Sequence, residues 1–247
     1  MCITAHPDDE CGAFGGALLM AHAAGVETTV ICLTEGRAAS NRGAAASGEE
    51  LAQLRRAELA AAGEVLGLTR EEVLHYPDGR LADQDLNELV GVLVERIRRW
   101  RPQVVLTFGG EGGVNLHRDH TVASMAATAA FHWAGRKAAF PAQIDRGMQV
   151  YWPQKLYYSG TPFLMVRDDA EKAGTCLTPY SLTMELGEYT EKKFEAFRKH
   201  ATQATILDKG REIIEPTMHV EHYLLVAARG IQAVGADKSM FQGVVED

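Results

Sequence analysis

The stretch from Ala5 to Glu10 (AHPDDE) places one imidazole and three carboxylates between a short apolar run and an alanine-rich segment. The apolar run, Met1 to Ala5, predicts a strand. The segment from Asp9 to Ala24 has helical periodicity and ends at Gly25, a residue type that commonly terminates helices. Ligands of open α/β sheets bind beyond the carboxyl ends of the strands. The stretch therefore predicts a strand-to-helix junction that carries a functional site.

Strand and helix patterns continue to alternate over the first half of the chain. Further strands are expected at 26–33, 72–76 and 103–108, and further helices at 48–66 (capped by Ser47), 83–100 and 121–134. This alternation indicates an α/β fold with a mostly parallel, doubly wound sheet, in which helices cover both faces. In such a sheet the first and fourth strands are often neighbours at the crevice where ligands bind.

The pattern changes after Pro141. Short strands are expected at 155–159, 163–167 and 223–227, and a charged amphipathic helix at 188–204. A chain of 247 residues is long enough for one large α/β domain. We therefore expect a single domain over 1–247, with a βα core and site at 1–135 and a small α+β extension at 136–247, on the substrate side.

Composition excludes several classes of protein. The net charge of −8 argues against nucleic-acid and membrane partners, which favour clustered Lys and Arg. We find no apolar run of about 18 residues and no signal-peptide pattern, so we expect neither a membrane span nor export. The cysteines, which are Cys2, Cys11, Cys32 and Cys176, form no C-x-x-C pair. A reducing cytoplasm is the expected location.

A second cluster of polar residues follows the expected strand at 103–108. His117, Asp119 and His120 come after a glycine-rich loop, and this cluster and the first lie at the same end of the expected sheet. Two imidazoles and one carboxylate, with one position open for water, form a typical catalytic Zn²⁺ site. The spacing predicts that the metal ligands are His6, Asp9 and His120.

The remaining polar residues of the two clusters suggest catalytic roles. Asp8 lies beside the ligands and is a candidate general base. His117 is a candidate acid that would stabilise the oxyanion or protonate the leaving amine, and Asp119 a group that would orient an imidazole. Glu10 is expected to be a charge in the first helical turn. Dinucleotide binding is excluded because no G-x-G-x-x-G follows the first strand.

These two clusters together resemble the PIG-L/LmbE-like family of zinc-dependent de-N-acetylases, which includes the mycothiol and bacillithiol deacetylases. Further resemblance lies in the segments 34–43, 77–81 (PDGRL) and 199–203 (KHATQ), so that it covers about 1–203 in matching order. The resemblance implies a Rossmann-like fold and the hydrolysis of an N-acyl group on an amino sugar. It also implies metal ligation by His6, Asp9 and His120, with Asp8 as base and His117 paired with Asp119.

Other residues are assigned from this resemblance or remain open. Arg118 replaces the proline that is common in the second motif, and Asn115 stands near the position where some members place a tyrosine oxyanion donor. Candidate substrate-binding residues are Arg42, Asn115 and His200, although a solvated helix face is an equally good interpretation of His200. We expect Asp78 to fix the turn at 77–80 rather than to bind substrate.

The leading hypothesis is a metal-dependent hydrolase that removes the N-acetyl group from an N-acetylglucosamine-type conjugate. An alternative is an amidase that acts on a thiol-sugar conjugate or a glycosylated secondary metabolite, and a weaker one is a non-catalytic sugar-binding metalloprotein. Zn²⁺ is the expected cofactor, although Fe²⁺, Mn²⁺ or Co²⁺ also suits a His₂Asp site. The expected partner is a small N-acyl amino sugar, and a homo-oligomer is possible.

Overall fold

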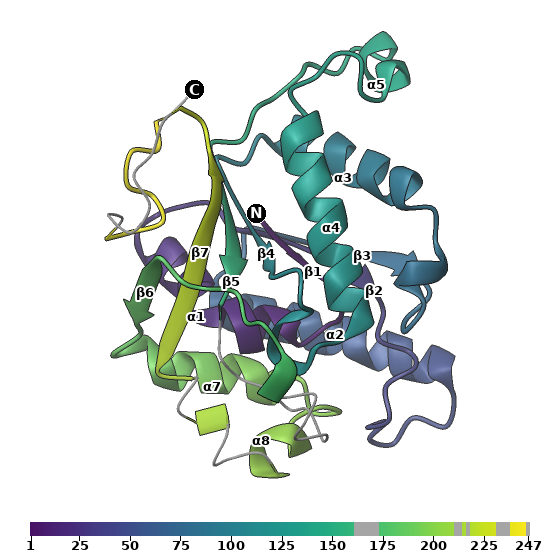
Figure 1. The fold of residues 1–247 in the computed structure, drawn as a ribbon. Coiled ribbons are helices and arrows are strands. Elements are labelled where there is room, and N and C mark those ends of the chain that lie inside the picture. The colour runs from purple at the N-terminus through teal and green to yellow at the C-terminus, as the bar shows by residue number, and fades with distance from the viewer. Residues whose placement is uncertain (161–172, 210–213, 216–217, 231–237, 246–247) are drawn as a thin grey trace.

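The computed structural model describes residues 1–160, 173–209, 214–215, 218–230 and 238–245. Seven strands form one sheet in the order β3-β2-β1-β4-β5-β7-β6 (Figure 1). The strands are β1 (Cys2–Thr4), β2 (Thr29–Thr34), β3 (Arg70–Tyr76), β4 (Val104–Phe108), β5 (Lys155–Ser159), β6 (Leu182–Glu185) and β7 (Val220–Ala228). The mostly parallel α/β sheet predicted from the sequence is confirmed.

Helices cover both faces of the sheet (Figure 1). On one side α1 (Asp9–Ala23), α2 (Gly48–Leu66) and α7 (Tyr189–Lys199) contact one another. On the other side α3 (Leu86–Trp100) packs against α4 (Arg118–Trp133). Strands β1 to β5 are parallel, and β1 pairs with both β2 and β4. The two polar clusters therefore follow neighbouring parallel strands, as the sequence predicted.

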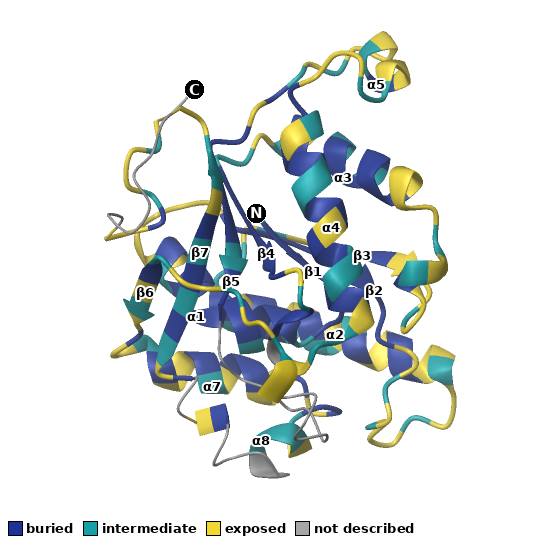
Figure 2. Cartoon of the chain, in the orientation of Figure 1, coloured by how far each residue is buried: buried dark blue, intermediate teal, exposed yellow. Residues whose placement is uncertain are grey.

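Strand β1 has three residues but lies in the centre of the sheet. Ile3 pairs with Ile31 of β2, and Cys2 pairs with Leu106 of β4. All three residues of β1 are buried (Figure 2). The amino group of Met1 adds a hydrogen bond to the carbonyl oxygen of Val104 at 2.9 Å. Pairing on both sides explains how so short a strand stays in place.

Capping side chains set where the helices begin. Ser47 caps α2 by accepting the backbone N–H of Glu50, as expected. Helix α3 begins later than predicted, because the Asp85 carboxylate caps it and residues 81–83 form a short 3₁₀ helix, η1 (Leu81–Asp83). Helix α4 begins earlier than predicted, at Arg118, so that His120 lies in its first turn. A second 3₁₀ turn, η2 (Gly113–Asn115), precedes it.

The C-terminal part extends the same sheet. Strand β7 runs antiparallel to β5, and β6, which the sequence did not indicate, pairs with β7. The expected helix over 188–204 is wrong at its end: α7 stops at Lys199, and α8 (Thr205–Lys209) follows. A short α5 (Pro141–Asp145) lies further upstream. The strand expected at 163–167 lies outside the described residues.

A search of the described helices for membrane spans found none that is long and apolar enough to cross a bilayer.

Candidate metal centre and active site

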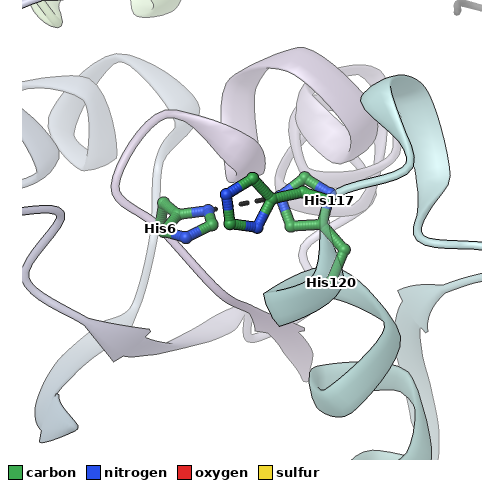
Figure 3. Close-up of side chains that lie close together, drawn as sticks. All are labelled: His6, His117 and His120. Carbon is green, nitrogen blue, oxygen red and sulfur yellow. Dashed lines mark hydrogen bonds between the residues drawn. The ribbon is translucent and has the colours of Figure 1, made fainter. Parts of the chain in front are cut away.

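The loop after β1 and the N-terminus of α4 bring three imidazoles together (Figure 3). His6 lies in the loop, His117 is the N-cap residue of α4, and His120 lies in its first turn. The ring centroids of His6 and His117 are 4.7 Å apart, and those of His6 and His120 are 5.2 Å apart. The two clusters that are separated by more than a hundred residues thus form one site.

Donor atoms of three side chains converge at this site. His120 Nε2 lies 3.2 Å from His6 Nδ1 and 3.1 Å from Asp9 Oδ1, and His6 Nδ1 lies 3.6 Å from Asp9 Oδ2. For metal–ligand bonds of about 2.1 Å, two ligands at the corners of a tetrahedron are about 3.4 Å apart. The spacing of these atoms therefore fits three ligands of one divalent ion.

The other polar atoms of Asp9 and His120 already have partners. Asp9 Oδ2 accepts the backbone N–H groups of Ala5 and His6, at 3.1 and 2.7 Å. His120 Nδ1 lies 2.9 Å from the carbonyl oxygen of Gly112, which fixes the tautomer with Nε2 free to bind a metal. Although burial opposes ionisation, contacts with His120 and His6 hold the pKa of Asp9 well below its usual range.

His6 is supported from behind by two carboxylates. Its Nε2 lies 3.1 Å from Asp78 Oδ1 and 3.4 Å from Asp119 Oδ2. Each carboxylate is itself held by backbone N–H groups, Asp78 by that of Ala38 and Asp119 by those of Gly79 and Leu81. An imidazole that ligates a metal usually donates its second N–H to such a carboxylate. The donor set and its outer contacts thus fit a bound metal ion.

Asp8 lies between the candidate ligands His6 and Asp9 in the sequence, but its carboxylate points towards Arg55. Its Oδ1 lies 3.1 Å from Nη2 of Arg55, a buried residue of α2. Burial raises the pKa of Asp8 to about 6, against the opposing effect of Arg55. Its backbone φ of 124° costs of order 1–3 kcal/mol for a residue other than glycine. A carboxylate with this pKa is suited to accept a proton near neutral pH.

The first turn of α4 fixes the ring of His117. Its Nδ1 accepts the backbone N–H of Asp119 at 3.1 Å. Burial, together with the nearby His6 and His120, lowers the pKa of His117. The neutral ring therefore carries its proton on Nε2, which can donate to a developing oxyanion. The carboxylate of Asp119 contacts His6, so the pairing with His117 that the resemblance implied is made by the backbone of Asp119.

A pocket of about 470 Å³ opens over this site. Polar lining residues surround the donor atoms: His6, Asp8, Asp9, Ser40, Asn41, Arg55, Asp78, Asn115, His117, His120 and Gln203. Apolar residues of the C-terminal part line another portion: Phe197, Ile206, Ile214 and Met218. The pocket therefore combines a charged reaction site with an apolar wall, a common arrangement in ligand sites.

The predicted substrate-binding residues differ in their placement. Asn115 lines the pocket, and its side-chain oxygen accepts the backbone N–H of His117. Arg42 is exposed and does not line the pocket, although its neighbours Ser40 and Asn41 do. His200 is fully buried, and its Nε2 lies 2.6 Å from Glu10 Oε1. His200 is therefore placed beneath the site, together with Glu10, which lies in the first turn of α1 as expected but is fully buried.

Two site residues were missed by sequence reasoning. Asp78 was interpreted as a turn residue, although it supports His6, and the resemblance of 77–81 to a family element was the available signal. Arg55 was not considered, since nothing in its helical segment distinguishes it from other arginines. It binds the Asp8 carboxylate and the backbone carbonyl groups of Pro7 and Gly36.

Comparisons with known proteins identify relatives of this chain. The family model PIG-L, described as GlcNAc-PI de-N-acetylase, matches residues 1–131. The 1D-myo-inositol 2-acetamido-2-deoxy-alpha-D-glucopyranoside deacetylase of Saccharomonospora viridis is 30% identical over 271 residues, covering 98% of this chain and 99% of the relative. The mycothiol S-conjugate amidase of Streptomyces coelicolor is 30% identical over 177 residues, covering 64% of this chain and 59% of the relative.

A solved structure shares the fold. The N,N'-diacetylchitobiose deacetylase from Pyrococcus horikoshii superposes with a TM-score of 0.76 at 20% sequence identity, covering 91% of this chain and 82% of the other. Its likeness extends beyond the family match into the C-terminal part of the chain. The Rossmann-like, LmbE-like architecture that the resemblance implied is therefore confirmed.

Proposed function

The chain belongs to the PIG-L family, and from that premise we propose that it is a metal-dependent hydrolase that removes the N-acetyl group from an N-acetylglucosamine-type conjugate. The single observation that best supports the metal-dependent part is the convergence of Nδ1 of His6, the carboxylate of Asp9 and Nε2 of His120. The products would be acetate and a free amine. Deacetylases among the relatives support this reaction type.

We propose that His6, Asp9 and His120 hold the metal ion, with Zn²⁺ as the expected ion and Fe²⁺, Mn²⁺ or Co²⁺ as substitutes. When bound there, the ion supplies Lewis acidity towards the amide carbonyl and lowers the pKa of a water molecule. Asp78 and Asp119 keep the His6 ring oriented, and the carbonyl oxygen of Gly112 does so for His120.

Asp8 and His117 then act on the amide from within the pocket. Asp8 removes a proton from the attacking water, because its raised pKa makes it a better base than an exposed aspartate. The Nε2–H group of His117 stabilises the charge that develops on the carbonyl oxygen. We propose that Asp8 passes its proton on to the leaving amine, which would restore the carboxylate for the next turnover.

The residues that line the pocket also predict the chemistry of the group that is joined to the amino sugar. The polar side offers Ser40, Asn41 and Gln203 to hydroxyl groups. The apolar wall, which includes Phe197 and Ile206, faces the same space. We therefore expect the conjugated group to present apolar surface to this wall, whereas the substrate for which the Saccharomonospora viridis deacetylase is named contains an inositol.

Acetate release tests the proposed function. The metal-free protein would be reloaded with each candidate ion and incubated with methyl and octyl N-acetylglucosaminides. We expect release after reloading, faster with the octyl compound, because each methylene buried on the apolar wall contributes up to about 0.8 kcal/mol. A metal-loaded protein that releases nothing from a broad panel of N-acyl amino sugars would refute the proposal.

The second candidate function is an amidase that acts on a thiol-sugar conjugate or a glycosylated secondary metabolite. The similarity to the mycothiol S-conjugate amidase favours it, and the same site residues would serve. A panel that contains both N-acetyl and larger N-acyl substrates separates the two. A non-catalytic sugar-binding role is disfavoured by Asp8, since binding alone requires no carboxylate with a raised pKa.

A cytoplasmic location, a homo-oligomer and the division of the chain into a βα core and a C-terminal extension remain predictions.

A further inference from the structure

A buried polar cluster lies beneath the active site and outside the pocket lining. Glu10 and His200 have no exposed surface, and Nε2 of His200 lies 2.6 Å from Oε1 of Glu10. The thiol of Cys11 also donates to Oε1 at 3.1 Å. Burying a charged carboxylate is costly unless its oxygens have partners. The cluster is therefore expected to serve a purpose that an apolar side chain would not.

The second oxygen of Glu10 indicates that purpose. Oε2 of Glu10 accepts the backbone N–H of Asp8 at 2.9 Å. The carbonyl oxygen of Asp8 accepts the N–H groups of Cys11 and Gly12, at 3.1 and 3.0 Å. Asp8 is thus fixed on both sides of its Cα, at the unfavourable φ of 124°. Surrounding contacts must over-determine such a conformation for it to persist.

We propose that Glu10 and His200 are positioning residues that hold the backbone of Asp8 in this conformation. The proposal rests on the proposed function to the extent that Asp8 is the general base. A chain of contacts then runs from the end of α7 through His200 and Glu10 to the Asp8 amide. This conformation keeps the Asp8 carboxylate in the pocket and against Arg55. The carboxylate is then not a ligand of the metal, unlike that of Asp9.

Kinetics of matched variants test this role. Glu10→Ala should lower kcat by about 10- to 100-fold, because small misplacements of a reacting group have effects of that order. KM should stay near that of the unaltered protein, since neither Glu10 nor His200 lines the pocket. Glu10→Gln should recover most of the activity, because its amide oxygen can still accept the Asp8 N–H. Lys199→Ala, an exposed neighbour of His200, is the control.

A double-mutant cycle separates positioning from general damage. If Glu10 acts through Asp8, Glu10→Ala should change the residual kcat of Asp8→Asn by no more than about twofold. His200→Ala should lower kcat less than Glu10→Ala does, because Glu10 keeps its hydrogen bond to the Asp8 N–H. It too should leave the residual kcat of Asp8→Asn nearly unchanged. The metal content of every variant should match that of the unaltered protein. A penalty that persists in full in Asp8→Asn, a change confined to KM, or loss of the metal would overturn the proposal.

A spectroscopic measurement decides the question independently of activity. The amide proton of Asp8 donates to a carboxylate, so its NMR resonance should move upfield in Glu10→Ala and stay in place in Lys199→Ala. An unmoved resonance would refute the positioning role even if the protein is a deacetylase. A moved resonance in a protein that hydrolyses no N-acyl amino sugar would support the positioning role and refute the proposed function.

Discussion

Asp8 is the residue on which the chemistry depends most. It lies between the proposed metal ligands His6 and Asp9 in the sequence, yet its carboxylate points to Arg55. We predict that Asp8→Asn binds metal as the unaltered protein does but loses about 10²- to 10⁴-fold in kcat, the usual contribution of a general base. Metal content by elemental analysis and kcat on one N-acetylglucosaminide measure both effects. Loss of the metal from this variant would instead identify Asp8 as a ligand.

The ionisation of Asp8 predicts how activity depends on pH. Burial raises its pKa to about 6, and the ionised form is the proposed base. Activity should therefore be present above the pKa and fall as the pH is lowered through it. A bound cation stabilises the carboxylate, so kcat/KM should show this acidic limb at or below a pH of about 6. Constant activity down to a pH of about 4 would contradict the assignment of Asp8 as base.

Sequence reasoning succeeded at the residue scale where a contact is encoded by local spacing. His6 and Asp9 are separated by three positions across a strand-to-helix junction, so they were expected to face one point, and they do. Asp78 and Arg55 reach the site from a turn after β3 and from α2, and those approaches depend on how distant elements pack. His200 shows the opposite case: the sequence left it open between a substrate-binding residue and part of a solvated helix face, but α7 ends at Lys199 and the ring is buried against Glu10.

At the scale of elements, α1 is fastened to the C-terminal part by a second buried cluster. Glu221 of β7 accepts the backbone N–H groups of Gly16 and Ala17 and lies 2.7 Å from the ammonium group of Lys193 in α7. Both charged side chains are fully buried. The hydroxyl of Tyr223 donates to the second oxygen of Glu221 at 2.7 Å. These contacts join the middle of α1 to α7 and β7.

Removing one charge of this buried pair should be costly. We predict that Glu221→Gln lowers the free energy of unfolding by about 3 kcal/mol, because a buried ammonium loses its compensating charge. Chemical denaturation monitored by circular dichroism measures the change. The additional substitution Lys193→Met should return part of the loss, since the charge that needed compensation is then absent. A loss below about 1 kcal/mol in the single variant would contradict this account.

The elements that sequence reasoning predicted well are those with strong periodicity or clear caps. Strand β4 and helix α2 were expected at nearly their observed bounds, because a buried apolar run and a Ser47 cap define them. Strand β6 was missed, since its four residues alternate in burial and it gains its partners from β7. The late start of α3 was missed because Asp83 and Asp85 are both acceptable caps, and only packing selects between them.

At the scale of the whole molecule, the order of strands creates the site. Because β1 and β4 are adjacent and parallel, the loops that follow them meet, and the proposed ligands His6, Asp9 and His120 come close together. The alternation of strand and helix patterns in the sequence predicted that β1 and β4 are neighbours. The antiparallel addition of β7 and β6 could not be predicted, because no crossover rule fixes the order of strands joined by irregular segments. That addition places α7 and its apolar residues beside the pocket.

The three proposed ligands place a carboxylate and two imidazoles close together in a buried site, so a bound metal should stabilise the whole fold. We predict that chelation lowers the melting temperature, and that adding Zn²⁺ back restores it. At a metal concentration about a hundredfold above Kd the stabilisation is about 2.7 kcal/mol. For a chain of this size that corresponds to a shift of roughly 5–10 °C, which differential scanning fluorimetry can detect.

A variant that lacks one ligand separates specific from general effects of the chelator. His120→Ala removes one donor atom while Asp9 keeps its backbone contacts, so its melting temperature should respond weakly or not at all to chelation and to added metal. Activity should follow the same pattern, returning with metal in the unaltered protein and staying low in the variant. If both proteins respond equally, the ion that stabilises the fold binds elsewhere, and His6, Asp9 and His120 would need another explanation for their close approach.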